Sequence, residues 1–214
     1  MTEADILNAK ILIIDDAEAN LKLLEDLLAR EGFHQIISTA DSTRALDLFK
    51  AFEPDLILLD LMMPELDGYA VLEMLSRHIP SDSYLPVLVV TADATIGAKR
   101  KALALGAKDF LTKPFDPYML TQKITAAMEK SHQIKANQDF VATYERHEAL
   151  LSEQERKIFG MILENQTSRE IAETLGNSTR TIEIHRASIF KKMGVTSILD
   201  LAKNSERYAL TKQA

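Results

Sequence analysis

The first part of the chain alternates short apolar runs with stretches of helical periodicity. A nearly continuous aliphatic run such as Leu56–Leu59 is typical of a strand that is buried on both faces of a parallel sheet. Other short apolar runs follow the same pattern along the chain. Together they predict five strands, over residues 10–14, 36–38, 56–59, 87–90 and 109–112.

Segments with apolar residues at helical spacing lie between these runs. Leu21, Leu24, Leu27 and Leu28, for example, share one side of a helix predicted over residues 20–30. The remaining helices are predicted over about 45–49, 68–76, 96–105 and from residue 116 onward. Five strands that alternate with five helices predict a doubly wound, flavodoxin-like α/β domain with a five-stranded parallel sheet.

Beyond residue 150 the pattern is helical throughout, and four helices are predicted over about 153–164, 168–175, 179–193 and 197–208. Their starts carry capping residues, because Ser and Thr side chains accept hydrogen bonds from first-turn amides. The two expected capping boxes and two further N-caps are Ser152 with Glu155, Thr167 with Glu170, Ser178 and Thr196. The expected core of this small all-α domain is Ile171, Ala172, Leu175, Ile182, Ile189 and Met193.

The stretch between these two patterns, about 129–149, is polar and lacks a clean apolar stripe. We interpret it as the frayed end of the preceding helix, running into a linker. A dimerising coiled coil is the alternative, although the heptad pattern is poor. The predicted organisation is therefore an α/β domain over 8–130, a helical linker over 131–148 and a helical domain over 149–214.

Composition narrows the class of protein. The 214 residues are 46% hydrophobic and 27% charged, as in ordinary globular proteins, and contain no cysteine, which excludes disulfides and thiolate metal sites. The first residues are acidic and do not resemble a signal peptide, and no apolar run reaches the ~20 residues of a membrane span. We therefore expect a cytoplasmic protein without a membrane partner.

The net charge of −7 is unevenly distributed. Residues 150–214 hold ten basic and eight acidic side chains, a net charge of +2, so the rest of the chain carries −9. An acidic domain followed by a mildly basic one is compatible with a signalling domain joined to a nucleic-acid reader.

The candidate chemistry lies where the predicted strands end. Asp15 and Asp16 follow the first strand, Asp60 the third, Thr91 the fourth and Lys113 the fifth. Ligands of open α/β sheets bind at the carboxyl ends of the strands, so these side chains are expected to converge. Three carboxylates would repel one another unless a divalent cation and the lysine offset their charge. The set predicts a phosphoryl-accepting site.

The strings DD, DLMMPELDG, TA and GAKDFLTKPF, in this order, resemble the receiver domain of two-component response regulators. The resemblance implies that a sensor histidine kinase, or a small phosphodonor, phosphorylates Asp60. It also implies that Lys113 pairs with the phosphoryl group and that Pro114 follows a cis peptide bond. The implied Mg²⁺ ligands are Asp15, Asp16, Asp60 and the backbone carbonyl of Met62, with Asp15 acting through water if the other two aspartates bind directly.

Thr91 and Phe110 are the switch residues that this resemblance implies. The Thr91 hydroxyl would bind a phosphoryl oxygen on Asp60, and Phe110, three residues before Lys113, would rotate into the vacated space. Phe110 has no hydroxyl, so its inward position would depend on packing alone. Plain core packing is the alternative for this side chain.

The strings REIAETLG and STRTIEIHRASIFKKMGV resemble the NarL/LuxR/FixJ-type helix-turn-helix. One face of its second helix would meet DNA, with Glu183 accepting from cytosine and Ile184 or Ala187 touching thymine methyl groups. The predicted contact residues are Arg180, Glu183, Ile184, Arg186, Ala187, Ser188 and Lys191, with Arg180, Arg186, Lys191 and Lys192 assigned to phosphates. Two positions depart from the family: Asn165 replaces a turn glycine, and Asn177 replaces an apolar residue at the corner of the motif.

The combined expectation is a two-domain response regulator. Phosphorylation would favour a homodimer that binds paired half-sites in operator DNA, and the chain would be no enzyme beyond slow self-dephosphorylation. One alternative is an interaction module whose C-terminal part binds protein instead of DNA. Another is a phosphohydrolase, although such aspartyl-phosphate enzymes usually carry a second aspartate where this chain has Met62.

Met62 also generates a prediction about the lifetime of the phosphorylated state. It stands two residues after Asp60, where a polar side chain could orient an attacking water molecule and Met could not. We expect Met62→Asn to accelerate dephosphorylation of the isolated protein, followed as the loss of label from Asp60. An unchanged rate of loss would contradict this role of position 62.

Overall fold

The five apolar runs form one parallel sheet in the computed structural model, which describes residues 3–80 and 83–213. The strand order is β2-β1-β3-β4-β5, which is the doubly wound, flavodoxin-like arrangement that the pattern predicts. The strands are β1 Lys10–Ile14, β2 Gln35–Thr39, β3 Leu56–Leu59, β4 Val87–Thr91 and β5 Asp109–Thr112. The chain divides into two compact units between Lys135 and Ala136.

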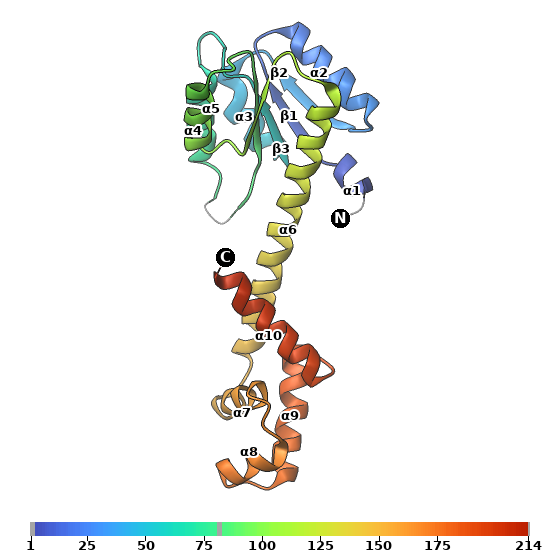
Figure 1. The fold of residues 1–214 in the computed structure, drawn as a ribbon, viewed down its shortest axis with the longest axis vertical. Helices are drawn as coiled ribbons and strands as arrows, with labels where there is room; N and C mark the ends of the chain where they lie inside the picture. The colour runs from blue at the N-terminus through green and yellow to red at the C-terminus, as the bar shows by residue number, and fades with distance from the viewer. Residues whose placement is uncertain (1–2, 81–82, 214) are drawn as a thin grey trace. The chain divides into compact units, whose positions relative to one another are not determined.

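Helices cover both faces of the sheet (Figure 1). One face packs against α2 and the first part of α6, and the other against α3, α4 and α5. All four residues of β3 are buried, as expected for a central strand with helices on both sides. The helices of this unit are α1 Glu3–Leu7, α2 Glu18–Arg30, α3 Ala45–Phe52, α4 Gly68–Ser76, α5 Ile96–Ala104 and the first part of α6. The short helix α1 and the 3-10 turn Ser42–Arg44 before α3 were not predicted.

Residues 131–148 are helical, as predicted for the linker, but the helix end is not frayed. Helix α6 runs without a break from Pro117 to Ala149 and contributes to both units. Its first half packs on the sheet through Leu120, Ile124 and Met128. Its last turns pack on the helical unit through Phe140 and Tyr144. Both ends of α6 are therefore anchored by tertiary packing, which stabilises helices more than intrinsic propensity does.

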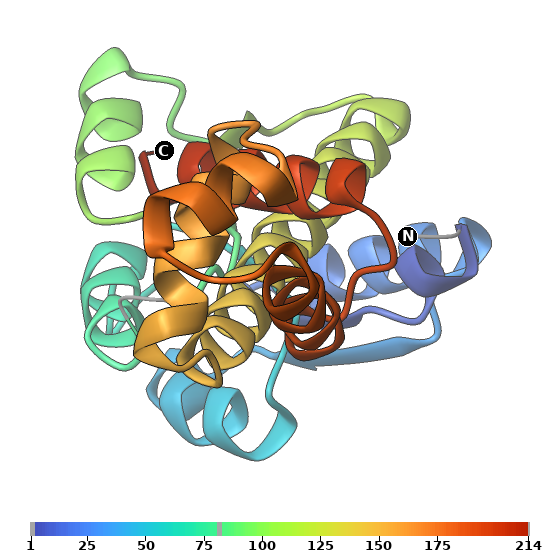
Figure 2. The ribbon, with the colours of Figure 1, turned by 90° about the horizontal axis from the view of Figure 1, so that it is seen from below.

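The second unit contains the end of α6 and the helices α7 Glu153–Leu163, α8 Ser168–Leu175, α9 Thr179–Met193 and α10 Ile198–Gln213. Figures 1 and 2 show α7 to α10 in orange and red from two directions. Both predicted capping boxes are present, and the Ser178 hydroxyl accepts from the Thr181 amide at the start of α9. The predicted apolar core is confirmed, with Leu175 partly buried and the other five residues buried.

Both positions that depart from the family form their turns, and one predicted N-cap is wrong. Asn165 has φ +63°, the left-handed conformation that the usual glycine of this turn would adopt. Asn177 satisfies its polar side chain by donating from its amide to the Leu175 carbonyl, so the turn forms without an apolar plug. Thr196 is not the N-cap of α10. The Ser197 hydroxyl accepts from the Asp200 amide instead, and α10 continues to Gln213.

Candidate functional site

Three carboxylates converge at the carboxyl edge of the sheet. Oxygen atoms of Asp15, Asp16 and Asp60 all lie within 4.8 Å of one another, with Asp15 and Asp60 buried and Asp16 exposed. The sheet hydrogen bonds continue one residue past the strands. The Asp15 amide donates to Thr39 over 3.2 Å, and the Asp60 amide to Ile14 over 2.9 Å. This extended ladder fixes the backbone from which the acids project.

Lys113 joins two of these acids. Its Nζ lies 2.5 Å from Oδ2 of Asp15 and 2.6 Å from Oδ2 of Asp60. Burial acts to lower the pKa of Lys113, but its hydrogen bonds with the two carboxylates and their negative charges outweigh that effect and raise the pKa. The lysine is therefore held as an ammonium ion between the acids that follow β1 and β3. The peptide bond between Lys113 and Pro114 is cis, as predicted.

The remaining contacts of the acids come from neighbouring loops. Oδ1 of Asp60 accepts from the Met62 amide over 3.0 Å, while the Met62 side chain is exposed. Oδ1 of Asp15 accepts from the Ala17 amide and from the side chain of Asn20, which the sequence reasoning missed. A carboxamide on the first turn of the next helix was the only available signal for Asn20.

Gly68 is a second residue whose role the sequence did not reveal, although it is the last residue of the string DLMMPELDG. A Cβ atom built at Gly68 would lie 2.1 Å from the carbonyl oxygen of Asp60 and 2.6 Å from Cα of Leu61. The start of α4 thus packs directly on the backbone of the acceptor loop. Only glycine permits this approach.

Of the two predicted switch residues, Thr91 is the last residue of β4 and Phe110 lies within β5. Thr91 is completely buried, and its carbonyl accepts from the Lys113 amide over 2.8 Å. Phe110 is buried in the core that lies under α3, α4 and α5. It also forms part of the wall of a hollow of about 430 Å³ beside α5, together with Ile96 and Leu103.

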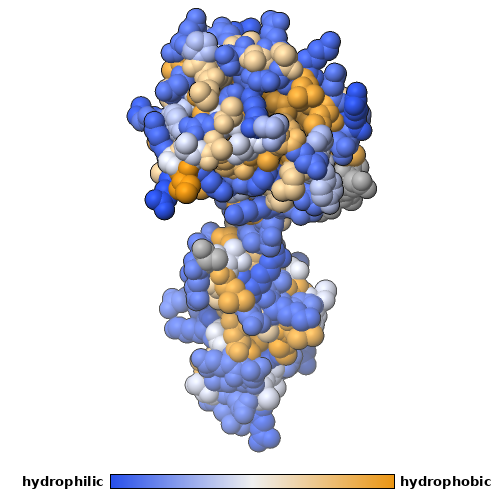
Figure 3. Space-filling model, turned by 45° about the horizontal axis from the view of Figure 1, so that its top comes forward, coloured by the Kyte–Doolittle hydropathy of each residue, from blue (hydrophilic) through white to orange (hydrophobic). Residues whose placement is uncertain are grey.

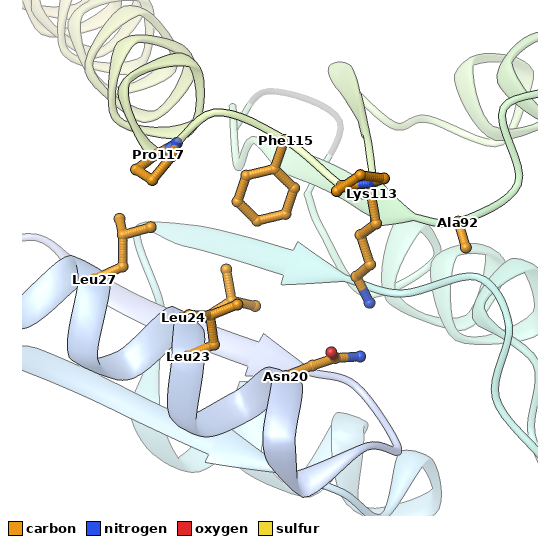
Figure 4. A pocket seen from close by; sticks show the side chains of 9 residues that line it. Asn20, Leu23, Leu24, Leu27, Ala92, Lys113, Phe115 and Pro117 are labelled. Atoms are coloured by element: carbon orange, nitrogen blue, oxygen red, sulfur yellow. The ribbon is translucent and has the colours of Figure 1, made fainter.

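An apolar hollow of about 410 Å³ opens beside Lys113 (Figure 4). Helix α2 contributes Leu23, Leu24 and Leu27 to its wall, and Phe115 and Pro117 lie opposite. Figure 3 shows a hollowed apolar area, in orange, on the side of this unit where α2 lies. Leu23 is 60% exposed, so this apolar surface is open to a partner.

The predicted DNA-contacting residues lie on α9 and divide into two groups. Arg180, Glu183, Ile184, Ala187 and Lys191 are exposed on the helix, and Arg186 is half-buried. Ser188 and Lys192 turn toward α7 instead. The Ser188 hydroxyl donates to Oε1 of Glu155 over 2.7 Å, and Lys192 Nζ lies 2.6 Å from Oε2 of the same residue. A buried carboxylate therefore binds both side chains in this structure, which leaves Arg180, Arg186 and Lys191 as the basic residues of α9 without this contact.

Glu155 connects the capping box of α7 to α9. It is 4% exposed and also accepts from the Ser152 amide over 2.7 Å. The Lys192 ammonium contributes most to lowering the pKa of Glu155 to about 2, followed by the Ser152 amide, against the effect of burial. The sequence predicted the capping role of Glu155 but contained no signal for its distant partners.

Comparison with known families gives two matches. The model described as "Response regulator receiver domain" matches residues 11–125. The model described as "Bacterial regulatory proteins, luxR family" matches residues 149–204. Asp15, Asp60 and Lys113 lie in the first match, and the whole of α9 lies in the second.

Individual relatives agree with both matches. Transcriptional regulatory protein FixJ of Bradyrhizobium diazoefficiens is 30% identical over 92% of this chain and 94% of its own length. A crystal structure of full-length FixJ has a TM-score of 0.60 at 28% identity, over 94% of this chain and 98% of that one. A probable transcriptional regulator, ycf27 of Porphyridium aerugineum, is 38% identical over 60% of this chain, which spans about half of that relative's length (51%).

Within the described parts of the chain, we find no helix long and apolar enough to cross a bilayer.

The lowered pKa of Glu155 predicts an acid-sensitive helical unit. Because the pKa in the folded state (about 2) is below the ordinary value of 4.5, the ionised carboxylate contributes stability above pH 4.5. That contribution is lost as the pH falls from 4.5 toward 2. We expect Glu155→Gln to cost about 2–3 kcal/mol at pH 7 and to flatten the pH dependence of unfolding in this window. Hydrogen exchange of the α9 amides at several pH values measures both effects.

Glu153→Gln is the matched control, because Glu153 is 89% exposed on the same helix and its ion pair is with Lys157, one turn away. It should change the stability by less than about 0.5 kcal/mol. A Glu155→Gln protein with the pH slope of the parent would show that this carboxylate does not cause the acid sensitivity.

Proposed function

Because the chain belongs to the response regulators, with a receiver domain followed by a LuxR-type DNA-binding domain, we propose that phosphorylation of Asp60 controls its binding to DNA. The single observation that carries this proposal is the bridge from Lys113 to Asp15 and Asp60 at the carboxyl edge of the sheet. The proposed phosphodonor is a sensor histidine kinase, and the proposed target is operator DNA. Such a regulator acts in the cytoplasm, where its DNA is.

Asp60 is suited to accept the phosphoryl group as a nucleophile. The Met62 amide binds Oδ1 and the Lys113 ammonium binds Oδ2, so both oxygens are oriented before the donor arrives. One of these oxygens forms the bond to phosphorus as the bond from phosphorus to the donor breaks, and the donor atom keeps the electron pair. Lys113 is then placed to bind an oxygen of the transferred group.

The donor set fits a hard divalent cation. Asp15, Asp16 and Asp60 supply oxygen ligands only, which suits Mg²⁺, and the Met62 carbonyl is proposed as a further ligand. Bound Mg²⁺ would neutralise charge that develops on the phosphoryl oxygens. Asn20 holds Asp15 through its side-chain amide, so this acid keeps one orientation in the cluster.

Thr91 and Phe110 are the proposed route from the phosphoryl group to the α5 side of the domain. The Thr91 hydroxyl interacts only weakly, accepting from the Asp93 amide over 3.4 Å, so it can turn to a new acceptor. Movement of the loop after Thr91 would reshape the wall that Phe110 shares with Ile96 and Leu103. Phosphorylation then shifts a conformational equilibrium toward the DNA-binding form.

Helix α9 is the proposed DNA-reading element. Its exposed Glu183, Ile184 and Ala187 are suited to base edges in the major groove. Arg180, Arg186 and Lys191 supply the positive charge that phosphates require, without sequence preference. One short helix reads few base pairs, so we propose a homodimer on paired half-sites.

The apolar hollow beside Lys113 is the proposed docking place for the kinase. A protein phosphodonor must bring a histidine to Asp60, and the wall of α2 is the adjacent exposed apolar surface. Slow self-dephosphorylation fits the exposed, apolar Met62 at the position where a water-orienting side chain would stand.

The first test concerns Asp60 itself. We expect Asp60→Asn to abolish the uptake of label from acetyl phosphate, because the amide is a poor nucleophile and loses the charge that attracts the cation. The same variant should lose the phosphorylation-dependent gain in DNA binding. Arg186→Ala should keep full uptake but weaken DNA binding and reduce its salt dependence, measured as retardation of a labelled duplex.

The combination of the two variants separates the functions of the two domains. Undiminished labelling of Asp60→Asn would overturn the assignment of the acceptor. Normal labelling of the parent without any DNA binding would instead favour a protein-binding role for the C-terminal domain. Repeated release of phosphate by the parent at Asp60 would favour a phosphohydrolase.

The second test concerns the docking surface. The kinase used is the sensor histidine kinase that phosphorylates the parent protein fastest. We expect Leu23→Asp to slow phosphoryl transfer from this kinase about tenfold, because a charge replaces a leucine that would be buried in the complex. Transfer from acetyl phosphate, which needs no protein contact, should stay within about twofold of the parent. Stopped time courses of labelling with the two donors measure the difference.

Leu199→Asp introduces the same charge at an exposed leucine of α10 that does not line the hollow, and is the control. It should leave both rates unchanged. Equal slowing with both donors in Leu23→Asp would mean that the substitution disturbs the acceptor site and not the docking of the kinase.

A further inference from the structure

Two segments outside both family matches bind each other. The receiver match ends at residue 125, and the luxR match covers 149–204. The last turns of α6 lie between the matches, and the second half of α10 lies beyond them. Within the second unit, side chains from these two segments interact over several helical turns. The family resemblance therefore gives no account of this contact.

Aromatic side chains form the centre of the contact. The rings of Tyr144 and Tyr208 are stacked, with centroids 4.3 Å apart and an angle of 16° between their planes. Phe140 lies one turn before Tyr144 on α6, and the Arg207 guanidinium of α10 lies 4.0 Å from the centroid of its ring. Stacking and cation–π contacts of this kind each add stabilisation beyond the apolar area that they bury. We call Phe140, Tyr144, Arg207 and Tyr208 the aromatic clasp.

Polar bonds fix the direction of both tyrosines. The hydroxyl groups of Tyr144 and Ser205 lie 2.8 Å apart. The Tyr208 hydroxyl donates to Glu145 over 3.1 Å, and Lys212 Nζ lies 2.7 Å from the same carboxylate. Both hydroxyls of the clasp are thus satisfied by residues of the opposite helix. This makes the register between α6 and α10 specific.

The clasp holds α6 against the end of α9. Tyr144 is 6% exposed and belongs to the core that contains Ile182, Ile189 and Met193 of α9. One turn later on α6, His147 lies over the glycine that ends α9. A Cβ atom built at Gly194 would lie 3.2 Å from Cε1 of His147.

Gly194 determines where α9 stops. Its φ of +68° is the left-handed conformation that ends a helix, and its amide and that of Val195 return to carbonyls of the last turn. Lys191, an exposed residue of the proposed DNA-reading face, lies in that turn. A side chain of α6 that fixes Gly194 therefore also fixes the backbone from which Lys191 projects.

We infer that Tyr144 and His147 of α6 are positioning residues for the DNA-reading helix. Arg207 and Tyr208, the α10 side of the aromatic clasp, hold this part of α6 in place. The DNA-reading unit then begins within α6, near residue 136, and not at the start of the family match. This inference rests on the proposed function, because it assigns a task in DNA binding to residues that touch no DNA.

The experiment uses the full chain and three substitutions. Tyr208→Ala removes the stacked ring without changing the charge. Tyr208→Phe keeps the ring and loses only the bond to Glu145. Tyr118→Ala removes a tyrosine that is 66% exposed on the first turn of α6, and serves as the control. The DNA is the 30-bp duplex that the parent enriches most from a randomised library (about 30 bp covers two half-sites).

We expect Tyr208→Ala to weaken binding about 5- to 20-fold, at a temperature where its helical circular dichroism equals that of the parent. Tyr208→Phe and Tyr118→Ala should stay within about twofold of the parent. The salt dependence of binding should not change in any of them, because no phosphate contact is lost. Hydrogen exchange at the end of α9 should become faster in Tyr208→Ala alone.

A purely stabilising clasp would lower the melting temperature of Tyr208→Ala and leave its DNA affinity at low temperature unchanged, which would overturn the inference. If Tyr208→Ala does not fold, Arg207→Lys replaces it, since lysine keeps the charge but loses the planar contact with Phe140. If the parent enriches no duplex, the proposed DNA binding fails. The positioning of α9 is then judged by hydrogen exchange, and unchanged exchange in Tyr208→Ala refutes it.

Discussion

The bridge from Lys113 to Asp15 and Asp60 is the interaction on which the receiver unit depends. A parallel sheet with both faces covered brings its strand ends to one edge, and this chain places acids at two neighbouring ends. Two buried carboxylates without a counter-charge would carry a large desolvation and repulsion cost. The ammonium group offsets that cost and leaves the outer side of the cluster open, where Asp16 is exposed. The lysine therefore compensates the charge from inside the fold, while solvent reaches the cluster from its outer side. A phosphoryl acceptor requires both.

Features set by local sequence were predictable. The five strands, both capping boxes and the Ser178 cap follow from residues within a few positions of one another, so the sequence alone contains the signal. Contacts between distant residues had no such signal. Glu155 could be predicted as a cap but not as the partner of Lys192, which lies 37 positions away. Helix α6 was misjudged for the same reason, because its polar middle has no apolar stripe of its own. Partners from two different cores hold its two halves.

The contacts of Ser188 and Lys192 with Glu155 affect how the charge of α9 is distributed. The sequence offered four basic side chains for phosphate contacts, but Lys192 is committed to Glu155. Pairing with a buried carboxylate fixes the rotation of α9 about its own axis, so the exposed Glu183, Ile184 and Ala187 share one outward face. Lys192 therefore helps to hold the orientation of the proposed DNA-reading face. His147 and the aromatic clasp act at the end of the same helix, so rotation and termination of α9 are set by different partners.

The two units use the same physical device for opposite purposes. In each, a buried carboxylate on one element binds a lysine from another, as Asp60 with Lys113 and Glu155 with Lys192. An ionised carboxylate has about four lone-pair positions for hydrogen bonds. Glu155 fills three of them, with the Ser152 amide, the Ser188 hydroxyl and Lys192, and so has little capacity for a ligand. Asp60 receives the Met62 amide and Lys113 and retains capacity toward its acidic neighbours. The number of donors around each acid therefore distinguishes the two carboxylates: Glu155 is nearly saturated by its own fold, whereas Asp60, the proposed phosphoryl acceptor, keeps capacity for a ligand.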